Sequence, residues 1–207
     1  MVGIPSPHAT LVIVHADESC LGNQNEEPSP GGSGAMIEFR GADGIVRQDF
    51  FAASPATTNN KMALKGAIDV LSILGDDEGE YYPAIVYHSD SQYLVKGITE
   101  WVHDWERRGW RRKGGEVQNL ALWKALLSLS RRGDVRWRWV RGHAGQVKNE
   151  YADHLAVCTA ERQADSHGLV PSEFPEWLAR QQTSGKLSGY DADADFEQLA
   201  RRYSTDS

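Results

Sequence analysis

The order of the regular segments is the feature of this sequence that most restricts its fold. Residues 11–14 (Leu-Val-Ile-Val) are a short apolar run rich in β-branched residues, which is typical of a central strand. Residues 35–40 and 45–52 flank an Asp-Gly turn and predict a hairpin. The later segments are a helix from residue 60, a strand at 84–87, helices at 92–98, 100–107 and 117–130, a strand at 135–140 and a helix at 149–163. This order predicts an α/β fold in which helices cover a mixed sheet.

Two parts of the chain carry weaker signals. Residues 22–34 hold Asn, Pro and four glycines, which predict a loop. Beyond residue 163, helices are expected only at 172–180 and 196–203, with a stretch of low hydrophobicity between them. We therefore divide the chain into an N-terminal segment (1–9), a main domain (10–163) and a C-terminal extension (164–207), which we expect to be docked or partly ordered.

The charge distribution says more than the net charge of −7, which alone argues against nucleic acid as a partner. Residues 101–141 contain eleven Lys or Arg against four Asp or Glu. Residues 161–207 contain five against nine. A basic module followed by an acidic tail is the better description, and the basic module favours contact with nucleic acid.

Compartment signals are few. The sequence has no apolar run of about 18 residues, the length that a membrane-spanning helix needs. Its N-terminus lacks a basic segment followed by an apolar stretch, so no secretory signal is predicted. The cysteines Cys20 and Cys158 lie far apart and are interpreted as reduced thiols. We expect a cytoplasmic, monomeric protein.

Asp17 and Asp90 each follow a predicted central strand. If the two strands are neighbours, both carboxylates emerge at one edge of the sheet. Taken singly, an Asp at a strand end is more often a turn or cap residue. Together they match the chemistry of two-metal phosphodiester hydrolysis, which needs several carboxylates at one point. Such oxygen ligands suit Mg²⁺.

Six collinear blocks between residues 10 and 163 resemble the motifs of bacterial type 1 ribonuclease H. The blocks are Asp-Glu-Ser-Cys-Leu-Gly-Asn at 17–23 with Pro-Gly-Gly-Ser-Gly-Ala at 30–35, Thr-Thr-Asn-Asn-Lys-Met at 57–62, Ser-Asp-Ser-Gln-Tyr at 89–93, the basic segment 97–110, Trp-Arg-Trp-Val-Arg-Gly-His-Ala-Gly at 137–145, and 149–153 with its final Asp. The extension has no counterpart in this pattern. The main domain is therefore interpreted as a ribonuclease H domain.

The resemblance implies a five-stranded mixed sheet flanked by helices. It also implies an endonuclease that cleaves the RNA strand of RNA–DNA hybrids with two Mg²⁺ ions, which Mn²⁺ can replace. The metal ligands would be Asp17, Asp90 and Asp153. His143, in a Gly-flanked loop, would assist water activation or product release, and Glu150 would have a supporting place close to the site.

Substrate-binding residues are also implied by the resemblance. Asn23, Asn59 and Gln92 would contact RNA 2′-hydroxyl groups, which distinguish RNA from DNA, and Thr58 would lie near a DNA phosphate. A basic protrusion would hold the DNA strand, through Trp101, Trp105, Arg107, Arg108, Arg111 and Arg112. The structural alternatives are helix capping by the asparagines and a core position for at least one tryptophan.

Ala63 is a departure from the family pattern, because it stands where the family has its second catalytic carboxylate, a Glu. We therefore expect turnover to be abolished or strongly impaired and hybrid binding to be retained, and we expect Ala63→Glu to restore cleavage. An engineered inactive variant is the favoured explanation, and natural loss or rerouting of the activity is the alternative. The corresponding alternative function is a non-catalytic protein that binds RNA–DNA hybrids.

Glu18 is a second departure, because the family usually has Gly directly after its first Asp. It could in principle donate a carboxylate. Successive side chains of a strand point to opposite faces, however, so we expect Glu18 to point away from the site. A different nuclease or an integrase of the same superfold is a weaker alternative, because the basic protrusion and the Gly-His-Ala-Gly block oppose it.

Overall fold

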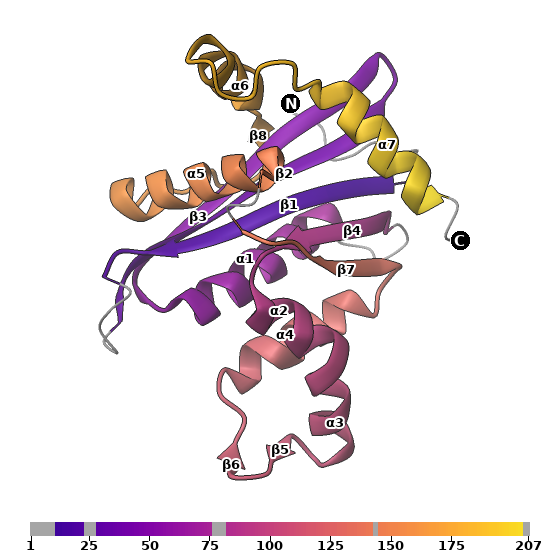
Figure 1. Ribbon diagram of the computed structural model, residues 1–207. Helices are drawn as coiled ribbons and strands as arrows, with labels where there is room; N and C mark the ends of the chain where they lie inside the picture. The colour runs from indigo at the N-terminus through magenta and orange to yellow at the C-terminus, as the bar shows by residue number, and fades with distance from the viewer. Residues whose placement is uncertain (1–10, 23–27, 76–81, 143–144, 205–207) are drawn as a thin grey trace.

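The computed structural model describes residues 11–22, 28–75, 82–142 and 145–204, and its centre is a mixed β-sheet (Figure 1). The sheet has the strand order β7-β4-β1-β2-β3-β8. Its strands are β1 (Leu11–Cys20), β2 (Ser29–Gly41), β3 (Gly44–Thr57), β4 (Ala84–Ser89), β7 (Val135–Trp139) and β8 (Val170–Pro171). β1 runs antiparallel to β2 and parallel to β4, and β4 runs parallel to β7. The predicted α/β fold with a mixed sheet is confirmed.

Helices cover both faces of the sheet (Figure 1). On one side of the sheet lie α1 (Asn59–Leu74), α2 (Gln92–Lys96) and α4 (Leu120–Ser130). The π-helical turn η1 (Gly97–Trp101) and α3 (Val102–Arg107) follow α2, and α3 lies in a protrusion away from the sheet. The other face carries α5 (Val147–Arg162), α6 (Phe174–Thr183) and α7 (Ala192–Ser204). The tip of the protrusion below α3 is a small hairpin of β5 (Arg111–Arg112) and β6 (Gly115–Glu116), which is too short for a sequence pattern to predict.

Strand β1 is buried on both faces, as expected for a central strand between two helical layers. Val12 and Val14 belong to the main core cluster, which also contains residues of α1 and α4 such as Leu64 and Leu126. Because side chains alternate along a strand, His15 and Asp17 lie on the opposite face, toward α5. The even-numbered residues of β1 therefore face α1.

The glycine-rich segment before residue 35 is a strand and not the predicted loop, because β2 begins at Ser29. Its glycines allow α5 to pack closely against β2. A Cβ atom on Gly32 would lie 2.5 Å from the backbone nitrogen of Ala160, and one on Gly34 would lie 2.6 Å from the Cβ of Leu155. Glycine in a strand often marks such a close approach of a second element. These residues let α5 lie directly on β2.

The C-terminal extension is docked along the part that the structure describes. β8 pairs with β3 and adds a sixth strand to the five that the family pattern implies. The buried Asp49 of β3 anchors the segment after β8, because its carboxylate accepts hydrogen bonds from Ser172 Oγ at 2.7 Å and the backbone nitrogen of Glu173 at 3.0 Å. Phe174 and Trp177 of α6 are buried with Tyr151 of α5 in a second core cluster. The two helices expected in this region are present as α6 and α7.

Within the described residues, no helix combines the length and the apolar character that a membrane crossing requires.

Candidate metal and catalytic site

The parallel pairing of β1 and β4 brings the two predicted strand-end carboxylates together. Ala16 pairs with Ser89, the last residue of β4, so Asp17 and Asp90 follow at the same edge. One carboxylate oxygen from each of Asp17, Glu18 and Asp90 lies within 4.8 Å of the others. All three side chains are half-buried. The structure therefore places the two expected aspartates in one acidic cluster and adds Glu18 to them.

The expectation that Glu18 points away from the site is wrong. Neighbouring side chains of β1 leave the strand on opposite faces. Asp17 accepts a hydrogen bond from Asn149 of α5, and both Asp17 and Glu18 line a cavity with residues of α1. However, β4 ends at Ser89, so no strand separates the two faces beyond that residue. Side chains from both faces of β1 can therefore reach Asp90 at this open corner.

Ala63 lies beside Glu18 and not beside an empty carboxylate position. Both residues line a cavity of about 10 Å³, together with Met62 and Tyr87. That volume holds about one water molecule. Ala63 itself is buried, with 5% of its surface exposed. Glu18 and Ala63 thus face the same small cavity beside the acidic cluster.

Burial and mutual repulsion perturb the cluster electrostatically. Burial, followed by the nearby charge of Asp90, raises the pKa of Glu18 to about 8. Burial and then the charges of Asp90 and Glu18 also raise the pKa of Asp17 well above its usual range. These raised pKa values mean that the carboxylates of Asp17 and Glu18, when ionised, have no neighbouring positive charge among the described residues to compensate them. Clustered hard oxygen donors with this deficit fit a divalent cation.

Neighbouring groups fix the aspartates. Asp17 Oδ2 accepts a hydrogen bond from Asn149 Nδ2 at 2.7 Å, and Asp17 Oδ1 accepts one from the backbone nitrogen of Glu18 at 2.7 Å. Trp139 Nε1 donates to the backbone oxygen of Asp90 at 3.0 Å. Gly142 lies against the Asp90 carboxylate, because a Cβ atom at this position would be 2.2 Å from Asp90 Oδ2.

Asp153 of α5 is half-buried and lies outside the group of oxygens within 4.8 Å, but its charge contributes to the raised pKa of Asp17. Asp153 therefore stays a candidate ligand for an ion held between it and Asp17. Two further predicted residues, Asn23 and His143, fall outside the residues that the structure describes.

Three predicted substrate-binding residues, Thr58, Asn59 and Gln92, lie at the starts of helices. Thr58 caps α1, because its Oγ1 accepts a hydrogen bond from the backbone nitrogen of Lys61 at 3.4 Å. Asn59 begins α1, and its buried Oδ1 has no hydrogen-bond partner among the described residues. Gln92 is exposed at the start of α2. Thr58 therefore has a structural role as the helix cap, and its predicted contact with a DNA phosphate stays a prediction.

The protrusion combines a buried aromatic base with an exposed basic surface. Trp105 packs against Trp123, which is fully buried, at 5.8 Å between ring centroids, and Trp101 packs on Trp105 at 5.9 Å. Trp105 is thus half-buried and packed against the core cluster, as the structural alternative predicts. The four predicted arginines are exposed on α3, at its end and on β5, at Arg107, Arg108, Arg111 and Arg112. Arg107 is in an ion pair with Asp104.

Comparison with known proteins assigns the family. The RNase H family model matches residues 9–161. The chain is 45% identical to the ribonuclease H of Nitrosomonas eutropha over 148 residues, which are 70% of this chain and 86% of that protein. It is 42% identical to the ribonuclease HI of Caulobacter vibrioides over 147 residues, 70% of this chain and 89% of that protein. The chain belongs to the type 1 ribonuclease H family. It is accordingly a nuclease of the class that acts on RNA–DNA hybrids.

A solved structure adds detail to this assignment. LC9-RNase H1 is 48% identical to this ribonuclease H, with a TM-score of 0.77 over 86% of this chain and 84% of that one. It is described as a type 1 RNase H with the type 2 active-site motif. The family model ends at residue 161, so the C-terminal extension lies outside it.

Sequence reasoning missed Glu18 and Asn149 as parts of the site. The signal for Glu18 was present, because the chain departs from the family pattern twice, losing a Glu at position 63 and gaining one at position 18. Both positions line the same small cavity. Asn149 carried no comparable signal, since its hydrogen bond to Asp17 joins residues 132 positions apart in the sequence.

Proposed function

We propose that this ribonuclease H is catalytically active, cleaving the RNA strand of RNA–DNA hybrids with Glu18 in the role of the carboxylate absent at position 63. The observation that carries the proposal is the position of the Glu18 carboxylate, which has an oxygen within 4.8 Å of oxygens of both Asp17 and Asp90. This proposal replaces the expectation that Ala63 abolishes or strongly impairs turnover. A precedent for an altered motif is LC9-RNase H1, described as a type 1 enzyme with the type 2 active-site motif.

The cofactor we propose is a pair of Mg²⁺ ions, which Mn²⁺ can replace. Bound divalent ions supply an activated water and stabilise charge on the leaving oxygen. Asp17, Glu18 and Asp90 would hold them, with Asp153 as a further ligand. Because Asp17 and Glu18 have raised pKa values without metal, ion binding would release protons from these carboxyl groups.

Substrate binding is assigned to surfaces beside this cluster. The arginines of the protrusion are exposed and would neutralise phosphates of the DNA strand. The polar side chains of Asn59 and Gln92 would contact 2′-hydroxyl groups, the feature by which a protein tells RNA from DNA.

A turnover assay on a labelled hybrid tests the proposal. We expect the chain as it stands to cleave the RNA strand in Mg²⁺ and Glu18→Gln to lower kcat by about a thousandfold, because charge stabilisation in such a site is worth several kcal/mol. Hybrid affinity measured without metal should change little. The control is Glu176→Gln, which alters an exposed glutamate of α6.

The competing function is a non-catalytic hybrid-binding protein, which Ala63 favours. Tight hybrid binding without cleavage in either Mg²⁺ or Mn²⁺ would establish that function and reject ours. If the parent protein and Glu18→Gln cleave the hybrid at the same rate, the protein is an active ribonuclease H but Glu18 does not have the proposed role.

A further inference from the structure

Helix α7 of the C-terminal extension contacts every element that carries a residue of the proposed metal site. β1 carries Asp17, β4 leads to Asp90, and α5 carries Asn149 and Asp153. α7 lies across these elements on the α5 side of the sheet (Figure 1). The contacts are polar, largely buried and close to the site residues along the chain.

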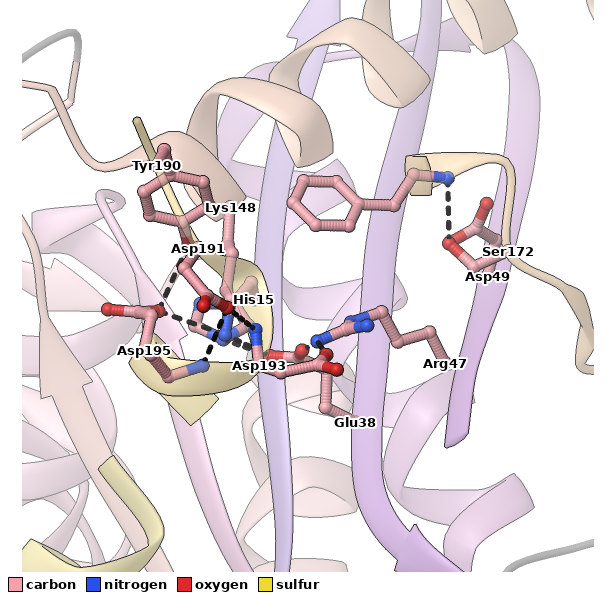
Figure 2. A network of polar contacts seen from close by, with 12 residues as sticks. His15, Glu38, Arg47, Asp49, Lys148, Ser172, Tyr190, Asp191, Asp193 and Asp195 are labelled. Carbon is pink, nitrogen blue, oxygen red and sulfur yellow. Dashed lines mark hydrogen bonds and ion pairs between the residues drawn. The ribbon is translucent and has the colours of Figure 1, made fainter. Parts of the chain in front are cut away.

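The contact with α5 is an ion pair of Lys148. Its Nζ lies 2.9 Å from Asp195 Oδ2 of α7 and 2.7 Å from Glu38 Oε2 of β2 (Figure 2). The Lys148 side chain is 3% exposed and that of Glu38 is fully buried. The Asp195 side chain is 35% exposed, so its ion pair with Lys148 is partly buried, and together with the buried pair to Glu38 it holds Lys148 in the first turn of α5. The next residue is Asn149, whose Nδ2 donates to Asp17.

The contact with β1 and β4 runs through two stacked histidines. The rings of His15 and His88 lie parallel at 5.0 Å between centroids. Tyr203 Oη of α7 is 3.1 Å from His88 Nε2, and His15 Nε2 is 3.2 Å from Glu38 Oε2. Each histidine stands two positions before a site aspartate, His15 before Asp17 and His88 before Asp90. Each histidine is therefore separated from its aspartate by a single residue of the chain.

Further bonds hold α7 in this place. Arg136 Nη1 of β7 donates to the backbone oxygen of Tyr203 at 2.7 Å. Arg47 of β3 joins Glu38 at 2.8 Å and Asp193 of α7 at 2.6 Å (Figure 2). Glu38 is thus the centre of a buried network, and the positive groups around it hold its pKa at about 2 despite its burial. The network joins the extension to both the sheet and α5.

We propose that α7 is a positioning element of the metal site, in which Asp195 and Tyr203 hold Lys148 and His88 and thereby set the orientation of Asn149, Asp17 and Asp90. Groups behind a metal ligand fix its geometry, and their loss typically weakens metal binding or activity. The inference rests on the proposed function, in which these carboxylates hold the metal. It gives a role to a segment that lies outside the family model.

Conservative variants separate positioning from plain stabilisation. Asp195→Asn removes the charge that pairs with Lys148 but keeps an oxygen for Tyr190 Oη, which donates to Asp195 at 3.1 Å. Tyr203→Phe removes only the hydroxyl group that contacts His88. The matched control on the same helix is Glu197→Gln, which breaks an ion pair with Arg40 at the surface.

Two readouts apply to each variant and to the Asp195→Asn, Tyr203→Phe double variant. One is the Mg²⁺ concentration that gives half of the Mg²⁺-induced rise in Tm, measured without substrate. The other is the NMR signal of the Asn149 side-chain amide without metal. Hybrid cleavage then gives kcat and KM separately.

We expect the double variant to need about three to ten times more Mg²⁺ and to lose kcat by a similar factor, which is less than the full effect of removing a direct partner of a ligand. KM for the hybrid should stay within about twofold, because the phosphate contacts that set hybrid binding lie on the protrusion. The Asn149 amide signal should shift. Asp195→Glu should restore most of the Mg²⁺ affinity, and Glu197→Gln should change neither readout.

A lower Tm with unchanged Mg²⁺ dependence and an unchanged Asn149 signal would overturn the proposal and leave α7 a stabilising helix. The proposal would also be overturned if Glu197→Gln changed the Mg²⁺ dependence and the Asn149 signal as much as the double variant does. If the parent protein neither binds Mg²⁺ nor cleaves hybrid, the proposed function fails. The Asn149 signal still decides in that case whether α7 orients this side chain.

Discussion

Ala63 and Glu18 are two walls of one small cavity, and this proximity changes what a glutamate at position 63 should do. The cavity of about 10 Å³ leaves no room for a longer side chain unless Glu18 moves. Ala63→Glu would also place a second carboxyl group beside one whose pKa is already raised. We now expect this substitution to destabilise the protein by about 1–3 kcal/mol, as overpacking of a core does, without raising cleavage.

Urea unfolding and hybrid cleavage of Ala63→Glu measure both effects. The double variant Glu18→Gly, Ala63→Glu restores the family pattern and should recover much of the activity that Glu18→Gly alone loses. A rise in cleavage by orders of magnitude in the single variant Ala63→Glu would instead support the expectation drawn from the sequence.

The raised pKa of Glu18 predicts how the stability of the metal-free protein depends on pH. Its pKa rises from an ordinary 4.5 to about 8 in the folded, metal-free protein. Between these values the folded state binds more protons than the unfolded state, so the free energy of unfolding falls as pH rises. The shift of Asp17 has the same direction and adds to the effect.

Thermal unfolding in a chelating buffer checks this prediction. The difference between the Tm of the parent protein and that of Glu18→Gln should fall as pH rises through the interval from 4.5 to about 8. The comparison with Glu18→Gln is needed because buried histidines such as His88, whose pKa is lowered by burial, change Tm in the opposite direction in both proteins. Saturating Mg²⁺ should remove much of the fall, since the ion favours the ionised carboxylates. A Tm difference between the parent protein and Glu18→Gln that rises with pH in this interval would contradict the assigned burial of Glu18.

At the scale of elements, the sequence predicts those helices and strands that are determined by the pattern of neighbouring residues. The longer helices, the apolar strands β1 and β4 and the alternating strand β7 follow from local patterns, and the predicted elements occur in the predicted order. The segment Ser29–Gly34 was misread because its glycines allow α5 to approach β2, an effect of tertiary packing. The direction of Glu18 was misread for a similar reason. Alternation along a strand holds locally, but the point where β4 ends is a property of the sheet.

Packing of α5 on β2 can be tested at Gly32. A methyl group there would lie 2.5 Å from the backbone nitrogen of Ala160, and backbone cannot move aside as a flexible side chain can. We expect Gly32→Ala to lower the free energy of unfolding by about 1–3 kcal/mol, the usual cost of overpacking. Because α5 carries Asn149 and Asp153, cleavage should fall as well. Unchanged urea unfolding would show that α5 is not packed this closely.

At the scale of the molecule, opposite charges are separated in space. The exposed arginines lie on the protrusion below the sheet, whereas the acidic extension lies on the opposite side, over α5 and β3 (Figure 1). Several acidic groups of the extension are held in internal ion pairs, such as Asp193 with Arg47 and Asp195 with Lys148. The net charge of −7 therefore understates the attraction of the protrusion for a nucleic acid.

Replacing Arg107, Arg108, Arg111 and Arg112 together by Ala tests whether the protrusion holds the hybrid. Each phosphate contact that is lost removes a counterion from the binding equilibrium, so affinity should fall and the plot of log K against log salt should become less steep by about 0.9 per contact. These arginines are exposed, and Tm should therefore change little. Arg180→Ala, an exposed arginine of α6, serves as the control and should leave the slope as it is. A quadruple variant with an unchanged slope would remove the protrusion from the path of the substrate, even if its affinity fell. In that case the binding surface would have to be sought among the residues beside the carboxylate cluster itself.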